Sequence, residues 1–252
     1  MKQHNHFKNA SICIITLIFL SSAPLSIAQN LRIAVAANFH QTLLKLAHAF
    51  EAQHNIALSI SSASSGKHYA QILHGAPFDV FLSADQDKID RLISSDHVKE
   101  KDSFIYAQGQ LALFSSNPKF WPMNLQSLKQ ENLRLAMANP KLAPYGMAAQ
   151  SFLNHLGISK TTKMITGENI AQAFHFTNSG NADLGLVALS QLIKDQSKES
   201  YKVVPQTLYK PILQKGAVLH NSGYKEQGRI FLTFLQSKKA KAIMQRFGYQ
   251  SP

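Results

Sequence analysis

Residues with polar side chains stand at three places where a predicted strand ends and a predicted helix begins. Asn38 follows a short apolar stretch, Ser65 ends a serine-rich turn, and Tyr145 follows a turn that contains two prolines. A helix start leaves backbone N–H groups unpaired and carries a partial positive charge. Such residues can either cap the helix or help to hold an anion, and the residue types alone leave both readings open.

The predicted alternation of strands and helices determines where these residues would lie in the fold. The apolar run 31–37 reads as a buried strand, and the helix after it has Asn38 as its predicted N-cap and an apolar face made of Phe39, Leu43, Leu46, Ala47 and Phe50. Strands at 56–61 and 78–83 are each followed by a helical pattern as well. Three such units predict a parallel sheet, whose strand ends bring Asn38 and Ser65 to one edge.

A second series of strands and helices follows residue 105 and gives the chain its predicted division. Gly109 interrupts a long strand pattern at 104–114, the alternation then restarts, and late strands appear at 202–205 and 212–219. The order predicts an α/β protein of two lobes with mainly parallel sheets. Residues 29–105 and 207–252 would form lobe I and residues 106–206 lobe II, joined by two crossings of the chain. A hinged pair of lobes encloses a cleft.

The first 28 residues have the pattern of a signal peptide. Lys2 and Lys8 precede a short apolar core, and small residues ending at Ala28 provide a cleavage site before Gln29. The only cysteine, Cys13, lies in that core, so a mature chain starting at Gln29 would contain no thiol. We therefore expect a periplasmic protein without disulfide bonds or cysteine-bound metal.

The chain is strongly basic, with a formal net charge of +12. That balance is compatible with nucleic acid, an anionic surface or an anionic ligand as partner, or with a merely solvated basic surface. The lysines are spread over predicted helix faces and loops, and no basic run alternates with aromatic residues. The pattern therefore argues against nucleic-acid binding.

Motifs of the common enzyme classes are missing from the sequence. It has no Gly-x-Ser-x-Gly elbow and no His-Glu-x-x-His, and its histidines are scattered. Gly66-Lys67 resembles the end of a phosphate loop, but the first glycine is absent and His68 replaces the magnesium-binding Ser or Thr. We expect a binding protein that is not an enzyme and needs no cofactor.

Several segments together resemble the periplasmic molybdate-binding proteins of ABC import systems. The resemblance runs through nearly the whole mature chain in one order, so it is far more specific than any single segment. The matching segments are Ala36-Ala37-Asn38-Phe39, Ser64-Ser65, the stretch 75–85 (GAPFDVFLSAD), Asn139-Pro140, Ala143-Pro144-Tyr145-Gly146 and Arg246-Phe247-Gly248-Tyr249.

The resemblance implies a type II periplasmic binding fold that holds molybdate or tungstate between its lobes and delivers it to a membrane permease. It implies a monomer whose ligand residues are Asn38, Ser65, Tyr145 and Ile170, the last through its backbone N–H. Some members have a tyrosine where this chain has Ala188, so Tyr145 could supply that hydroxyl instead. A receptor for sulfate, thiosulfate or phosphate stays open as the alternative, because the binding of any of these anions at helix starts would give a similar sequence pattern.

Overall fold

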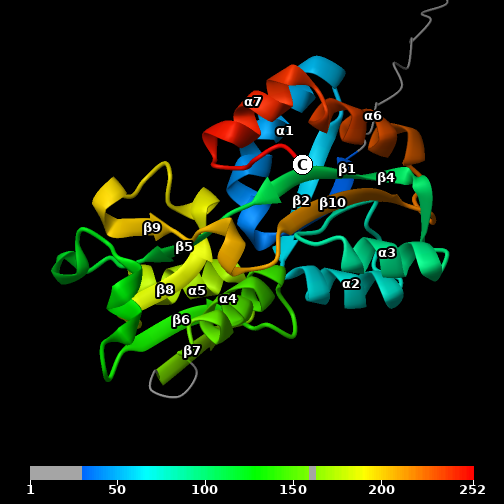
Figure 1. Cartoon of the computed structure of the whole chain (residues 1–252). Helices are drawn as coiled ribbons and strands as arrows, with labels where there is room; N and C mark the ends of the chain where they lie inside the picture. Colours follow the sequence, from blue (N-terminus) through cyan, green and yellow to red (C-terminus); the bar gives the residue numbers. More distant parts are fainter. Residues whose placement is uncertain (1–29, 159–162) are drawn as a thin grey trace, which may run out of the picture.

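Two sheets of five strands organise the chain in the computed structural model, which describes residues 30–158 and 163–252 (Figure 1). Each sheet forms a lobe with its own helices, and the two lobes lie side by side. The predicted signal peptide, residues 1–28, lies outside the described residues. Within the described ranges, no helix has the length and apolar character needed to cross a membrane.

The first lobe contains the strand order β2-β1-β3-β10-β4. Helices α1, α6 and α7 cover one face of this sheet and α2 and α3 the other (Figure 1). Its elements are β1 (Asn30–Ala36), the short 3-10 helix η1 (Ala37–Phe39), α1 (His40–His54), β2 (Ala57–Ala63), α2 (Ser65–Leu73), β3 (Val80–Leu82), α3 (Asp87–Ser94), β4 (Val98–Gly109), β10 (Ile212–Leu219), α6 (Lys225–Leu235) and α7 (Lys238–Arg246).

The second lobe has the strand order β7-β6-β8-β5-β9. Helices α4 and α5 pack on its sheet, and four 3-10 turns (η2, η3, η4 and η5) lie between its strands. Its elements are β5 (Leu111–Phe114), η2 (Pro118–Phe120), η3 (Leu125–Lys129), β6 (Arg134–Ala138), α4 (Pro144–His155), β7 (Lys163–Gly167), α5 (Ile170–Asn178), β8 (Leu184–Ala188), η4 (Leu189–Gln191), η5 (Lys198–Ser200) and β9 (Tyr201–Val203).

Both sheets are mixed, so the expectation of mainly parallel sheets holds only for three strands of each. In the first sheet β1 pairs in parallel with β2 and β3, whereas β10 is antiparallel to β3 and β4. The second sheet repeats this arrangement, with β5 antiparallel to β8 and β9. The antiparallel strands β4, β5, β9 and β10 are those that carry the chain between the lobes, through residue 110 and through residues 204–211. The predicted lobe boundaries at 105–106 and 206–207 fall close to these passages and stay predictions.

An ion pair of the same kind fixes the start of the middle one of the three parallel strands in each lobe. Arg32 in β1 bonds the carboxylate of Asp79 through both its backbone N–H and its guanidinium, at 2.9–3.0 Å. Arg134 in β6 bonds Asp183 in the same manner, at 2.9–3.2 Å. Asp79 directly precedes β3 and Asp183 directly precedes β8, the neighbouring parallel strands. Each ion pair therefore fixes the register between two parallel strands whose far ends lie at the cleft.

Apolar packing explains why the predicted helix after the first strand forms. Its predicted apolar face, from Phe39 to Phe50, is fully buried against the first sheet. Ala36 and Ala84, at strand ends of the first lobe, belong to the hydrophobic cluster of the second lobe. The two lobes therefore touch at the ends of their strands.

Candidate functional site

Four helix starts, two from each lobe, line one small cavity between the lobes. The volume of this cavity is only about 10 Å³. Its lining residues are Ala36, Ala37, Asn38, Ser64, Ser65, Ala84, Ala143, Pro144, Tyr145, Asn169 and Ile170. All of the predicted ligand residues are among them. So small a cavity suits an ion of a few atoms rather than a sugar or a peptide, because ligand pockets for larger molecules measure roughly 300–1,000 Å³.

Ser65 is the first residue of α2 and is completely buried. Its hydroxyl oxygen accepts the backbone N–H of Ala84 at 2.9 Å. This leaves the hydroxyl hydrogen of Ser65 available for a ligand. Helix capping is performed by the preceding residue, since the Ser64 hydroxyl accepts the N–H of Lys67 at 3.3 Å. Ser64 therefore caps the helix, whereas the Ser65 hydroxyl hydrogen stays available to the cavity.

Backbone N–H groups at the starts of α2, α4 and α5 have no acceptor within their helices. In the described part of the chain, no protein acceptor pairs with the N–H of Ser65, Tyr145 or Ile170. The cap of α5 is Asn169, whose side-chain oxygen accepts the N–H groups of Ala171 and Gln172 at 2.9 and 3.1 Å. The Ile170 N–H is left for a group in the cavity.

Asn38 is not the N-cap of the first helix, so this prediction was wrong. It lies within η1, and α1 begins after Phe39 without any side-chain cap. The Asn38 amide instead donates to Gln214 Oε1 and to Tyr249 Oη, both at 3.0 Å. Contacts with residues far along the chain decided its orientation, and a local pattern cannot reveal them.

The Tyr145 side chain ends at the passage from β4 to β5, beside Gly109. A Cβ atom on Gly109 would collide with the Tyr145 hydroxyl and lie 2.8 Å from Gln214 Nε2. Neither Gly109 nor Gln214 lines the cavity. Complete burial raises the pKa of the Tyr145 hydroxyl well above its usual value. The hydroxyl is therefore neutral, and it has no hydrogen-bond partner among the described residues.

A buried polar cluster behind the cavity joins the lobes. We call it the hinge cluster; it consists of Asn38, Tyr106, Ser190, Gln214 and Tyr249. The Ser190 hydroxyl, from the second lobe, donates to the backbone carbonyl oxygen of Asn38 at 2.9 Å. The Tyr249 hydroxyl donates to the same oxygen at 2.8 Å. Tyr106 Oη donates to Gln214 Oε1 at 3.0 Å. Burial raises the pKa of Tyr249 to about 12, so this hydroxyl stays a donor at physiological pH.

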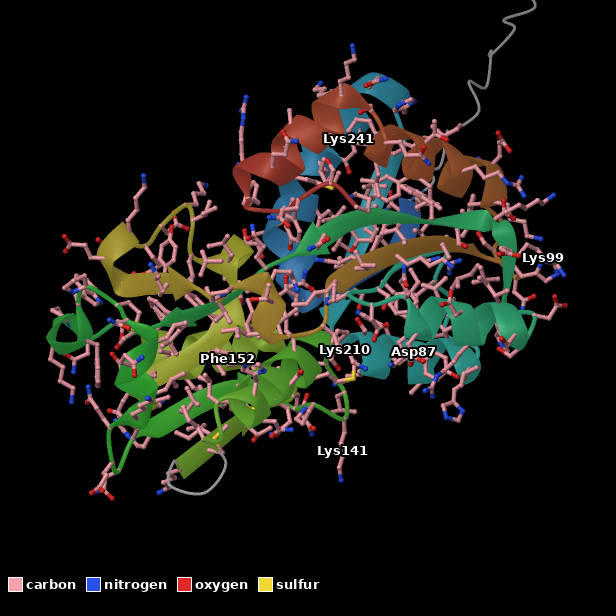
Figure 2. All side chains as sticks on the ribbon, viewed as in Figure 1. Asp87, Lys99, Lys141, Phe152, Lys210 and Lys241 are labelled. Carbon is pink, nitrogen blue, oxygen red and sulfur yellow. The ribbon has the colours of Figure 1, made fainter. Side chains whose placement is uncertain are left out.

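The charged residues lie around the cavity rather than in it. Of the described residues that line it, none carries a formal charge. Lys67 and Glu168 face each other from opposite lobes at 3.7 Å, and both side chains are more than half exposed. Lysines labelled at the periphery, such as Lys99, Lys141 and Lys241, point outward (Figure 2). A negative charge in the cavity would thus be held by dipoles and hydroxyl groups.

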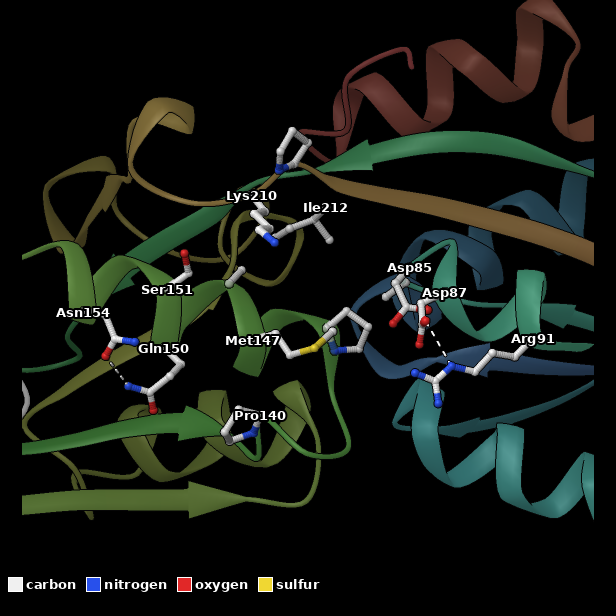
Figure 3. Close-up of a pocket in the computed structure, with 14 residues that line it drawn as sticks. Asp85, Asp87, Arg91, Pro140, Met147, Gln150, Ser151, Asn154, Lys210 and Ile212 are labelled. Carbon is white, nitrogen blue, oxygen red and sulfur yellow. Dashed lines mark hydrogen bonds and ion pairs between the residues drawn. The ribbon is translucent and has the colours of Figure 1, made fainter.

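A larger groove of about 680 Å³ adjoins the cavity and shares Ala84 and Pro144 with it. Met147 of α4 and Asp87 of α3 lie on opposite sides of this groove, and Asp87 pairs with Arg91 at 3.0 Å (Figure 3). The groove connects the small cavity with the surface between the lobes.

Sequence reasoning missed the supporting residues. Ser190 and Gln214 of the hinge cluster lie in no recognisable motif. Ala84, whose N–H donates to the Ser65 hydroxyl, lies in the stretch 75–85 that carries the resemblance, but no role was attached to it. Tyr249 did lie in a segment singled out by resemblance, Arg246 to Tyr249, but with no role attached to it. The missing information was in each case a contact between distant segments.

Comparison with known proteins agrees with this geometry. A family model described as "Bacterial extracellular solute-binding protein" matches residues 31–250. The chain is 36% identical over 218 residues to the molybdate-binding protein ModA of Rhodobacter capsulatus, covering 86% of each chain. It is 37% identical over 227 residues to ModA of Azotobacter vinelandii, covering 88% of this chain and 90% of that one.

A solved structure is similar over the same region. The Azotobacter vinelandii periplasmic molybdate-binding protein superposes with a TM-score of 0.83 at 35% identity, covering 88% of this chain and all of that one. The likeness confirms the expected two-lobe, type II periplasmic binding fold. Helix starts that converge between two lobes, a matching family model and these relatives lead to one assignment: this chain belongs to the bacterial extracellular solute-binding proteins and is related to the molybdate-binding proteins among them.

Proposed function

We propose that this protein captures molybdate outside the cytoplasm and delivers it to the membrane permease of an ABC importer. The observation that carries the proposal is the convergence of unpaired N–H groups and the Ser65 hydroxyl on one small uncharged cavity. A tetrahedral dianion is the ligand class that such donors suit. Each hydrogen bond to a charged group contributes about 1.5–3 kcal/mol.

Asn38, Ser65, Tyr145 and Ile170 are the proposed ligand residues. Ser65 would donate its hydroxyl, and the backbone N–H groups at all four positions would point at the oxygens. The same donors would accept tungstate, which has the same charge and shape. The protein acts in this proposal as a monomer, without a cofactor and without catalysis.

Phosphate fits the cavity less well than a fully deprotonated oxyanion. A hydrogen phosphate ion carries a proton that needs an acceptor, and no described lining residue has a carboxylate. Sulfate and thiosulfate lack that proton and differ from molybdate chiefly in size. Their binding affinities must therefore be compared with that of molybdate.

Calorimetric titration with molybdate, tungstate, sulfate, thiosulfate and phosphate tests the assignment. We expect tight binding of molybdate and a molybdate-induced rise in melting temperature that an equal concentration of sulfate does not produce. Ser65→Ala should reduce that rise while the ligand-free protein remains folded. An equal shift with molybdate and sulfate would reject molybdate as the preferred ligand.

We also propose a periplasmic location after cleavage between Ala28 and Gln29. The relatives are extracellular or periplasmic by description, and the basic start and apolar core of residues 1–28 support export. Intact-mass measurement of the exported protein decides the cleavage site. A mass that includes residues 1–28 would refute it.

A further inference from the structure

Two completely buried polar atoms, for which the described residues provide no hydrogen-bond partner, lie beside Gly109. They are the Tyr145 hydroxyl, from the second lobe, and Nε2 of Gln214, from β10 of the first lobe. A Cβ atom on Gly109 would collide with the Tyr145 hydroxyl and come within 2.8 Å of Gln214 Nε2. Leaving a buried polar group without a partner is energetically costly, so the position of these two atoms needs a reason.

The Gln214 side chain cannot turn away from Tyr145 without losing other contacts. Its Oε1 accepts both the Asn38 amide and the Tyr106 hydroxyl at 3.0 Å. Exchanging Oε1 with Nε2 would set an N–H group against the Asn38 amide donor. The network thus fixes Nε2 on the side of the amide that faces Gly109 and the Tyr145 hydroxyl.

Tyr145 spans the distance between the anion cavity and this point. Its backbone belongs to the helix start that lines the cavity, and its ring is only 1% exposed. An aromatic ring has a fixed length and few rotatable bonds. The hydroxyl end, resting on Gly109, therefore sets how closely the start of α4 can approach the first lobe.

We propose that Tyr145 is a positioning residue for the anion site through its side chain. In this role its hydroxyl rests on Gly109, beside Nε2 of Gln214, when the lobes are closed on the anion. The Tyr145 backbone N–H is thereby held at the right distance from the donors of the first lobe. The inference rests on the proposed oxyanion function and assigns the hydroxyl to the support of the site instead of to the ligand.

Gly109→Ala and Tyr145→Phe, alone and together, test this assignment by molybdate titration. The added methyl group should push the hydroxyl away and weaken binding by roughly tenfold or more, from the usual cost of overpacking. Tyr145→Phe should weaken binding in the wild-type background but strengthen it in the Gly109→Ala background, because it removes the atom that collides. This reversal of sign is the expected result.

A hydroxyl that donates directly to the anion predicts the opposite. The double variant would then bind molybdate more weakly than Gly109→Ala, and the proposal would be overturned. Should Gly109→Ala alone fail to fold, recovery of the ligand-free melting transition in the double variant supports the same collision. Recovery of neither folding nor affinity overturns it. Gly223→Ala is the matched control, since nothing lies within 4 Å of its Cβ position.

Failure of the proposed function looks different from failure of this inference. If the wild-type protein binds none of the tetrahedral oxyanions, the ligand assignment is wrong. If the wild type binds molybdate but the two substitutions act independently, only the positioning role of Tyr145 is wrong.

Discussion

The backbone N–H of Gly66 donates to the carbonyl oxygen of Leu142 across the cleft at 2.9 Å. Gly66 is the second residue of α2 in the first lobe, next to Ser65, and Leu142 lies in the turn before α4 of the second lobe. The structure therefore shows the lobes in contact at the mouth of the cavity. This contact can exist only while the lobes are closed.

Gly66→Ala should separate ligand affinity from stability. A Cβ atom at Gly66 would lie 2.8 Å from the Leu142 carbonyl oxygen, and backbone cannot move aside as a side chain can. We expect molybdate to bind roughly tenfold more weakly. The ligand-free protein should melt no lower than wild type, because alanine favours a helix over glycine. Titration and thermal melting of the same samples check both parts, and undiminished affinity would contradict the first.

Ser64→Ala and Ser65→Ala should differ in their effect on binding. Removing the Ser65 hydroxyl deletes a ligand donor and should cost about 1.5–3 kcal/mol of binding free energy, and it also lowers stability because the Ala84 N–H loses its acceptor. Removing the Ser64 hydroxyl deletes the cap of α2 and should cost about 1 kcal/mol of stability with little loss of affinity. Calorimetry and denaturant unfolding measure the two quantities. Equal binding losses in both variants would argue against a ligand contact specific to Ser65.

Salt should affect binding only weakly. Neutral donors hold the anion in this proposal, and the ion pair of Lys67 and Glu168 at the mouth is exposed. We expect the Kd for molybdate to change by less than about threefold between low and moderate salt, where exposed charges become screened. Lys67→Ala, measured in parallel, should bind almost as well as wild type. A steep loss of affinity with salt would instead indicate capture by lysine or arginine side chains.

Acid should destabilise the protein partly through His68. This side chain is completely buried near Phe78 and Phe81, and burial lowers its pKa below the ordinary 6.5. The unfolded chain thus takes up a proton at a higher pH than the folded chain does. Stability should be fully present above about pH 6.5 and fall as pH drops from there toward the lowered pKa of the folded state.

His68→Gln should flatten this part of the pH profile. Part of the slope should remain, because burial lowers the pKa of His40 as well. His175→Gln, on the exposed side of α5, is the matched surface control. The free energy of unfolding, measured by urea denaturation from pH 5 to pH 8, decides the point. An unchanged slope in His68→Gln would show that His68 does not contribute.

Local sequence was enough for the elements that deliver the site. Strand-to-helix turns depend on apolar periodicity and on small polar residues at helix starts, so Ser65, Tyr145 and Asn169 could be placed correctly from neighbours in the chain. The common edge of a sheet then predicted that Asn38 and Ser65 lie together, and both line the cavity.

Tertiary structure alone decided where side chains point and how the lobes meet. The Asn38 amide could have capped α1, but it bonds Gln214 and Tyr249, which lie 176 and 211 residues further along the chain. The antiparallel strands of each sheet likewise follow from where the chain crosses between lobes. Gly109 has no local need to be glycine, since its φ is not in the left-handed region; the space that its missing side chain leaves is taken by Tyr145. Such contacts join segments that lie far apart in the chain, so no periodicity or spacing along the sequence contains them.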